Sequence, residues 1–275
     1  MAGAGAALRA ATARADALPA NASARGVARA AGWFILALLL VLFRTPMIDR
    51  IVKPAAFALA VGGIAPAVEA RDAPPAAFVD VASVLTSARF DVRYHGTDNF
   101  VGARVDGYEA ARCYLTRPAA QALAGVEADL RTAGLDLLIF DCYRPTRAVA
   151  HFARWAADLA DQHTKARFYP DMDKKDLFAE GYIAARSGHS RGSTLDLTLI
   201  DATSGRELDM GTPFDLFSPR SWPGDTSVTP QQRANRRTLA DAMVRHGFVP
   251  FEKEWWHFTL ANEPFPDTYF DFPIR

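Results

Sequence analysis

The sequence lacks the features that mark several common functional classes. Basic side chains are not in excess, because 31 Lys and Arg are balanced by 31 Asp and Glu. Beyond residue 70 the balance is mildly acidic, with 24 basic and 28 acidic side chains. Proteins that bind a phosphate backbone need a basic patch, so we do not expect nucleic acid as a partner. A glycine-rich phosphate-binding loop is also missing.

Cysteine is equally scarce, with Cys113 and Cys142 as its only two occurrences. A structural zinc site of the all-cysteine type is therefore excluded, because no third or fourth thiol is available. In an exported protein an even pair can form a disulfide. Two buried thiols that act as small apolar side chains are the other reading, and the sequence alone does not decide between them.

Long apolar runs are absent as well. The two apolar runs near the N-terminus, residues 32–43 and 54–66, are shorter than the roughly 20 residues that cross a bilayer. From Met47 the chain has the charged, apolar and small-residue order of a secretory signal, which predicts cleavage after Ala70. The sequence therefore predicts an exported, for instance periplasmic, protein.

The residues before this signal have two interpretations. In the first, translation starts at Met47, residues 47–70 are the signal peptide and residues 1–46 are a doubtful extension that arises from the choice of start site. In the second, the extension is retained and residues 33–43 form part of a short membrane anchor. Contact with a membrane is expected only in the second case.

After a Pro- and Ala-rich linker at residues 71–77, we predict one domain over residues 78–275, with no internal repeat. Apolar periodicity with proline near the start predicts helices at 118–133, 145–161 and 229–246. Short apolar or alternating runs predict strands at 136–141, 194–200, 248–251 and 255–260. Because these elements show no regular βαβ order, we expect an α+β fold with a mainly antiparallel sheet packed by helices.

Two short motifs carry residues that bind metals. In the first, His189 lies in a polar turn and Asp196 follows seven residues later, on the polar face of an alternating strand. In the second, Glu254 precedes two tryptophans and His257. A regular strand would direct residues three apart to opposite faces, so we expect a bend or bulge between Glu254 and His257.

Together these residues predict a catalytic metal centre. Two imidazoles and one carboxylate, from His189, Asp196 and His257, leave one position of a tetrahedral Zn²⁺ open for water. We expect one Zn²⁺ per chain and Glu254 as the general base that activates this water. Taken singly, either motif is equally well explained by hydrogen bonding or by aromatic packing, so the prediction depends on their joint presence.

The sequence resembles the zinc D-alanyl-D-alanine dipeptidases, including the type used in vancomycin resistance. The resemblance covers most of the chain and is carried by seven segments in the same order. They are YHGTDNFVGARVDGY (94–108), DCYRPTRAV (141–149), SGHSRGSTLDLTL (187–199), MGTPFD (210–215), QRANRR (232–237), EWWHF (254–258) and YFDFP (269–273).

This resemblance implies roles for individual residues and a zinc D,D-peptidase or hedgehog-like fold. It implies that His189, Asp196 and His257 are the ligands and that Glu254 is the base. It also implies that Arg144 stabilises the developing oxyanion, a role in which a fixed cation is effective. Further implied contacts with the substrate come from Asp215, which would bind its ammonium group, and from Ser187 and Tyr94.

Three functions are compatible with these residues. The first is hydrolysis of the free D-alanyl-D-alanine dipeptide, which a carboxylate at Asp215 favours because it would bind a free amine. The second is a zinc D,D-carboxypeptidase that acts on longer cell-wall peptides. The third is a wall-binding module without catalysis, which the presence of all three ligands and of Glu254 disfavours.

Overall fold

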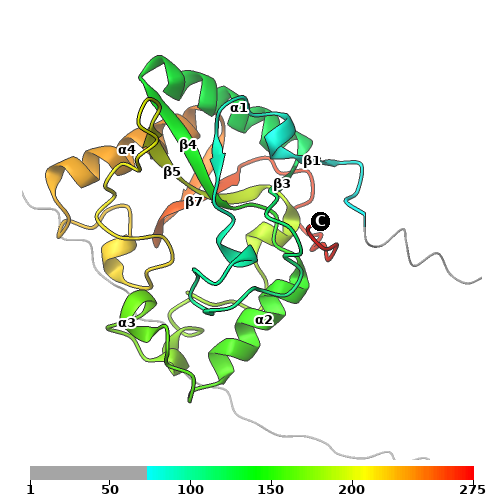
Figure 1. The fold of residues 1–275 in the computed structure, drawn as a ribbon, viewed down its shortest axis with the longest axis vertical. Coiled ribbons are helices and arrows are strands. Elements are labelled where there is room, and N and C mark those ends of the chain that lie inside the picture. Colours follow the sequence, from blue (N-terminus) through cyan, green and yellow to red (C-terminus); the bar gives the residue numbers. More distant parts are fainter. Residues whose placement is uncertain (1–72) are drawn as a thin grey trace, which may run out of the picture. The chain divides into compact units, whose positions relative to one another are not determined.

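A computed structural model describes residues 73–275 (Figure 1). The predicted extension (1–46) and signal peptide (47–70) lie outside the described residues. Within residues 73–275, no helix is both long and apolar enough to cross a membrane.

The central element is a five-stranded sheet in the order β2-β4-β5-β7-β6. Its strands are β2 (Arg89–Phe90), β4 (Leu135–Asp141), β5 (Thr194–Asp201), β7 (Glu254–Leu260) and β6 (Phe248–Phe251). All neighbours are antiparallel except β2 and β4, which are parallel. A separate antiparallel pair joins β1 (Phe78–Asp80) to β3 (Tyr114–Thr116). The mainly antiparallel α+β architecture predicted from the sequence is confirmed.

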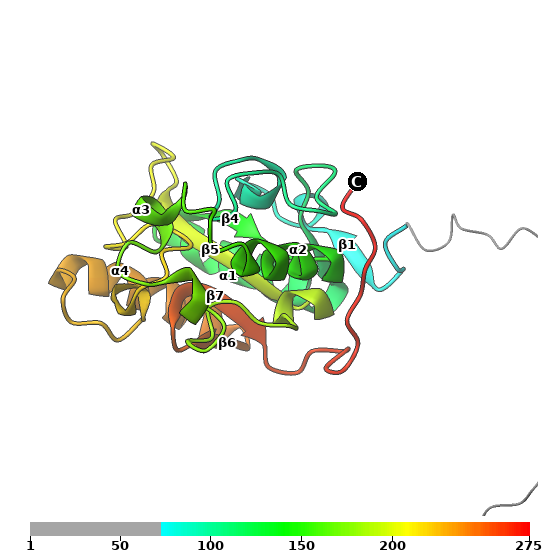
Figure 2. The same cartoon turned by 90° about the horizontal axis from the view of Figure 1, so that it is seen from below.

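The described residues form four α-helices, and two of them pack on each other and on the strands of this sheet. These two are α1 (Arg117–Thr132), which contacts β4, and α4 (Pro230–Arg245), which contacts β5, β6 and β7 (Figures 1 and 2). The others are α2 (Thr146–Ala157) and the short α3 (Lys165–Phe168). Single 3₁₀ turns are η2 (Val81–Ser83), η3 (Arg93–His95), η4 (Lys174–Asp176), η5 (Gly188–Arg191) and η6 (Pro219–Ser221).

The helix starts follow from local chemistry. Pro118 and Pro230 occupy first-turn positions, where the missing N–H costs nothing. Thr229 and Gln232 form a capping box at α4, since the side chain of each accepts a hydrogen bond from the backbone N–H of the other. Both predicted starts are therefore confirmed to within one residue.

The predicted end of the second helix is wrong by four residues. Helix α2 stops at Ala157 rather than at Asp161. The side chain of Asp158 accepts a hydrogen bond from the Ala160 backbone N–H at 3.2 Å, which forms a turn in place of a further helical turn. Lys174 then donates to the backbone carbonyls of Asp158 and Asp161, both at 2.8 Å. Lys174 thus forms hydrogen bonds with backbone carbonyl groups that would accept from backbone N–H groups in a longer helix.

The two cysteines are joined to each other rather than present as separate buried thiols. Cys113 and Cys142 form a disulfide, with their Cα atoms 5.3 Å apart. The bond connects the residue before β3 to the residue after β4. Because the chain turns from Cys142 directly into Tyr143 and Arg144, this crosslink holds the backbone next to the functional site described below.

Candidate active site

Three elements bring together the residues predicted to bind a metal. His189 lies in η5, Asp196 in β5 and His257 in β7. Asp196 and His257 are direct partners in the antiparallel β5–β7 ladder, so their side chains emerge side by side. After η5 the chain reverses at Gly192, whose φ of 83° and close approach to the Phe78 ring leave no room for a side chain. This reversal turns His189 back over Asp196.

The three side chains have the spacing of a tetrahedral metal site. His189 Nε2 lies 3.2 Å from His257 Nδ1 and 3.4 Å from Asp196 Oδ1, and His257 Nδ1 lies 3.1 Å from the same oxygen. Ligands held at about 2.0–2.1 Å by a tetrahedral Zn²⁺ are about 3.3–3.4 Å apart. The buried Asp196 Oδ1 also has no hydrogen-bond partner among the described residues. A cation between these atoms would satisfy it, so the donor set fits zinc.

The orientation of His189 is set by a backbone carbonyl. Its Nδ1 donates to the Cys142 carbonyl oxygen at 2.7 Å, which leaves Nε2 as the ring nitrogen that faces Asp196 and His257. Such a second contact fixes the tautomer and ring angle of a metal-binding histidine. Burial lowers the pKa of His189, so the imidazole is neutral and able to bind a metal. In Asp196, burial would raise the pKa, but the two imidazoles outweigh it and keep the carboxyl ionised.

Glu254 reaches this site through the expected irregularity in β7. In the β6–β7 pairing, Pro250 lies opposite Phe258, and the next residue, Phe251, lies opposite Glu254. Adjacent residues on β6 therefore pair with residues four apart on β7. This register shift turns Glu254 towards the same side as His257, and its Oε2 lies 3.5 Å from the imidazole Nδ1. Burial raises the pKa of Glu254 to about 7, the range suited to a group that both accepts and returns a proton.

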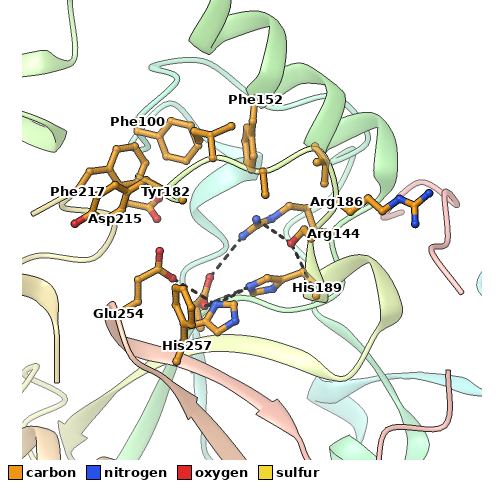
Figure 3. A pocket seen from close by; sticks show the side chains of 18 of the residues that line it. Phe100, Arg144, Phe152, Tyr182, Arg186, His189, Asp215, Phe217, Glu254 and His257 are labelled. Carbon is orange, nitrogen blue, oxygen red and sulfur yellow. Dashed lines mark hydrogen bonds and ion pairs between the residues drawn. The ribbon is translucent and has the colours of Figure 1, made fainter. Parts of the chain in front are cut away.

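In Figure 3, Arg144 lies above His189 and His257. Its Nε donates to Asp141 Oδ2 at 3.0 Å, and its Nη2 lies 2.8 Å from the same oxygen and 3.6 Å from Asp196. The guanidinium carbon also lies over the rings of Tyr94 and Phe152, at 5.0 and 5.1 Å. The cation is thus oriented in advance beside the metal-binding atoms, as an oxyanion-stabilising group must be.

Two buried residues that the sequence analysis did not single out complete this arrangement. Asp141, at the end of β4, accepts the hydrogen bond from Arg144, and Tyr108 donates to its other oxygen at 2.7 Å. The available signal was a carboxylate at the end of an apolar strand, three residues before Arg144. It points to no role by itself, because the partner Tyr108 lies 33 residues away in the sequence.

Asp215 lies at the other end of the cavity, away from Arg144 (Figure 3). Tyr94 donates to both of its oxygens, at 2.9 and 3.2 Å. Its φ of 61° is unusual for a residue other than glycine, and such conformations concentrate at functional sites. Burial, followed by the charge of Asp196, raises the pKa of Asp215 well above its ordinary value. A cation placed beside this carboxylate would therefore be strongly stabilised.

All the predicted site residues line one cavity of about 300 Å³. Ser187 joins them through its hydroxyl, which accepts from Arg144 Nη1 at 3.4 Å and from the His189 backbone N–H at 3.3 Å. Aromatic side chains also line the cavity, among them Phe100, Phe152 and Phe217. The structure thus brings together every residue that the sequence analysis named, while their individual roles stay predictions. We name these eight residues the catalytic set: Tyr94, Arg144, Ser187, His189, Asp196, Asp215, Glu254 and His257.

This geometry defines a class of protein. Two imidazoles and a carboxylate around one point, with a half-buried carboxyl group of raised pKa beside them and an arginine above them, form the site of a mononuclear metallohydrolase.

Comparison with known proteins specifies the class further. The chain belongs to the peptidase M15 family described as D-ala-D-ala dipeptidase, whose model matches residues 75–275. It is 46% identical over 198 residues to a D-alanyl-D-alanine dipeptidase of Streptomyces coelicolor, a match that covers 72% of this chain and 97% of the relative. A D-alanyl-D-alanine dipeptidase of Enterococcus faecium is 39% identical over 198 residues, which are 72% of this chain and 98% of the relative.

A solved structure is also similar at a greater distance. It is a mutant of the vancomycin resistance D,D-pentapeptidase VanY from a VanB-type resistance cassette, in complex with Zn(II). The two share 14% identity with a TM-score of 0.34, over 57% of this chain and 78% of the other. At this distance the similarity bears on neither fold nor chemistry.

Proposed function

We propose that this protein is a zinc metallopeptidase that hydrolyses the D-alanyl-D-alanine dipeptide. The observation that carries the proposal is the position of the buried carboxylate of Asp215 in the same cavity as the metal-binding side chains. A cavity of this kind binds a substrate that places a cation at one end and a scissile carbonyl near the metal. The names of the relatives, all D-alanyl-D-alanine dipeptidases, support this assignment.

His189, Asp196 and His257 would hold the zinc ion. When bound, zinc polarises the scissile carbonyl and makes water acidic enough to attack near neutral pH. Glu254 accepts the proton of the attacking water and then donates it to the nitrogen of the leaving residue. Its pKa of about 7 allows both transfers at neutral pH.

Arg144 acts on the charge that develops during the attack. Its guanidinium is held by Asp141 and by the two aromatic rings, so it needs no reorientation when the carbonyl oxygen becomes negative. The fixed position distinguishes this role from simple binding of the substrate. A flexible cation would lose part of its benefit in becoming ordered.

Asp215 explains the preference for a free dipeptide. The substrate ammonium group would compensate the buried carboxylate, and Tyr94 orients that carboxylate from the other side. In a longer peptide the same position holds a neutral amide, which cannot form an ion pair with the carboxylate. We therefore favour the dipeptidase over a D,D-carboxypeptidase.

The decisive experiment compares two substrates on the purified, zinc-loaded protein. One is D-alanyl-D-alanine and the other is its N-acetyl derivative, which has no ammonium group. We expect hydrolysis of the first to exceed that of the second by at least about 100-fold in kcat/KM, as for a charge-assisted contact in a buried site. Equal or faster hydrolysis of the acetylated substrate would favour the carboxypeptidase, and hydrolysis of neither would exclude both enzymes.

We also propose that the protein acts outside the cytoplasm. The supporting observation is the Cys113–Cys142 disulfide, since such bonds persist mainly in oxidising compartments. Fractionation of cells that express the native gene tests this proposal. Recovery of the protein from the cytoplasm with both thiols reduced would contradict it.

A further inference from the structure

A second cavity lies next to the catalytic cavity. It measures about 310 Å³, and Arg186 and Val149 line both it and the catalytic cavity. Its other walls include Ser190, Tyr269 and the acidic Asp267, which forms no ion pair with Arg186. Arg186 directly precedes Ser187 in the sequence, so it lies where the two cavities meet.

Arg186 differs from the other arginine of the catalytic cavity. Arg144 has its nitrogen atoms bound to Asp141 and Ser187. By contrast, within residues 73–275 no carboxylate lies within ion-pair distance of Arg186, whose guanidinium lies over the Tyr269 ring at 5.2 Å. In Figure 3 this side chain points away from Arg144 and His189. A cation–π contact at an exposed side chain is a weak restraint, so this guanidinium is free to reorient.

The polarity of the site shows which part of a substrate comes near Arg186. On the proposed function, the ammonium group lies at Asp215 and the scissile carbonyl lies between Arg144 and the metal-binding side chains. A dipeptide is about 7 Å long when extended, so its carboxylate must lie beyond the carbonyl, on the side away from Asp215. Figure 3 shows Asp215 and Arg186 on opposite sides of His189 and Arg144.

A carboxylate bound in the catalytic cavity is partly removed from water, and a cation that reaches it lowers the cost of that transfer. Arg144 already forms an ion pair with Asp141, and Arg186 is the other arginine that lines the cavity. Ser190 adds a second donor in the adjoining cavity. Its buried hydroxyl has no hydrogen-bond partner among the described residues.

We infer that Arg186 binds the carboxylate of the leaving residue and thereby selects substrates with a free C-terminus. The inference rests on the proposed dipeptidase function and adds to it the recognition of the second end of the substrate. Asp215 would bind the ammonium group and Arg186 the carboxylate, so only a substrate of dipeptide length would form both ion pairs. The fork of an arginine suits this task, since it can donate to both carboxylate oxygens.

The test uses D-alanyl-D-alanine and its C-terminal amide as substrates for the zinc-loaded protein. For the unaltered protein we expect kcat/KM for the amide to be lower by roughly 10- to 100-fold, mainly through KM, as for loss of a charge-assisted contact. In Arg186→Gln, KM for the dipeptide rises by a similar factor while the amide is little affected, so the two substrates become nearly equal. Arg186→Lys retains part of the discrimination, because it keeps the charge without the fork.

Arg191→Gln is the matched control. Arg191 lies over the same Tyr269 ring at 5.9 Å, but its guanidinium pairs with Glu263 at 2.8 Å and it does not line the catalytic cavity. This variant should keep the full discrimination between dipeptide and amide.

Two outcomes would overturn the inference. If Arg186→Gln discriminates as strongly as the unaltered protein, or if it slows both substrates equally through kcat, Arg186 does not bind the carboxylate. If the unaltered protein hydrolyses neither substrate despite a full complement of zinc, the proposed function itself fails. The two failures are therefore distinguishable.

Discussion

Asp196 on β5 and His257 on β7 are cross-strand partners, with the Asp196 Oδ1 3.1 Å from the His257 Nδ1. Two of the three metal-binding side chains therefore belong to a rigid antiparallel ladder. Only His189, in the turn before β5, depends on a loop, and the Cys142 carbonyl orients its ring. A site held in this way should lose metal when a ligand is changed while the fold survives.

Asp196→Asn should lower zinc affinity by at least about 100-fold. Asparagine keeps the shape but removes the negative charge, and even changes outside the direct ligands of metal sites cost about 10- to 100-fold. Competition with a chromophoric chelator measures the affinity, and circular dichroism checks the fold. Thr198→Val is the control, since Thr198 lies on the same face of β5 and its buried hydroxyl has no partner among the described residues. Unchanged zinc affinity in Asp196→Asn would exclude this residue as a ligand.

Glu254→Gln should lower kcat by about 10²- to 10⁴-fold, the usual contribution of a general base. Zinc content and KM should change little, because Glu254 is not among the three ligand residues. Steady-state kinetics with metal analysis on the same preparation measures all three quantities. The exposed Glu252 in the same β6–β7 hairpin provides the control Glu252→Gln. A variant that keeps its turnover would show that another group accepts the proton.

Replacing both cysteines by serine should lower the free energy of unfolding by about 3–4 kcal/mol. The crosslink closes a loop with a sequence separation of 29 residues, and constraining such a loop in the unfolded chain gives this magnitude. Urea denaturation, with and without a reducing agent, measures the effect. Reductant should destabilise the unaltered protein by a similar amount and leave the double variant unchanged. Equal stability of both proteins under oxidising conditions would contradict the prediction.

Glu127→Gln should destabilise the fold by about 1–3 kcal/mol at pH 7, as for unsatisfied buried partners. The Glu127 carboxylate accepts hydrogen bonds from the backbone N–H groups of Thr86, Ser87 and Ala88. Burial raises the pKa of Glu127, but these donors outweigh it and hold the pKa below the ordinary value of 4.5.

The sign of the pH dependence follows from this lowered pKa. A carboxyl group with a depressed pKa in the folded state stabilises fully above its unfolded pKa, here the ordinary value of 4.5, and loses that contribution as the pH falls through the folded pKa. The difference between the two proteins should therefore shrink from pH 7 to pH 3 in urea titrations. Glu180→Gln, at an exposed carboxylate, should show no such trend. A difference that stays constant with pH would contradict the assigned contacts.

Much of the fold could be predicted from local patterns. The strict alternation of Leu195, Leu197 and Leu199 predicted β5 and directed Asp196 to the opposite face. Proline and capping residues located the starts of α1 and α4. Short elements escaped prediction, including β1 and β2, because two or three residues carry no usable periodicity and their pairing depends on distant partners.

The catalytic set could be named from the sequence but not assembled from it. The motifs around His189 and Glu254 predicted the metal chemistry, since side-chain type and local periodicity are properties of adjacent residues. Tyr94, Arg144, Ser187 and Asp215 were named only through the resemblance to the zinc dipeptidases. The tertiary structure decided which groups meet: Asp196 with His257, Arg144 with Asp141, Asp215 with Tyr94, and Cys113 with Cys142. Most of these pairs join residues far apart in the chain, and only strand pairing and tertiary packing bring them into contact.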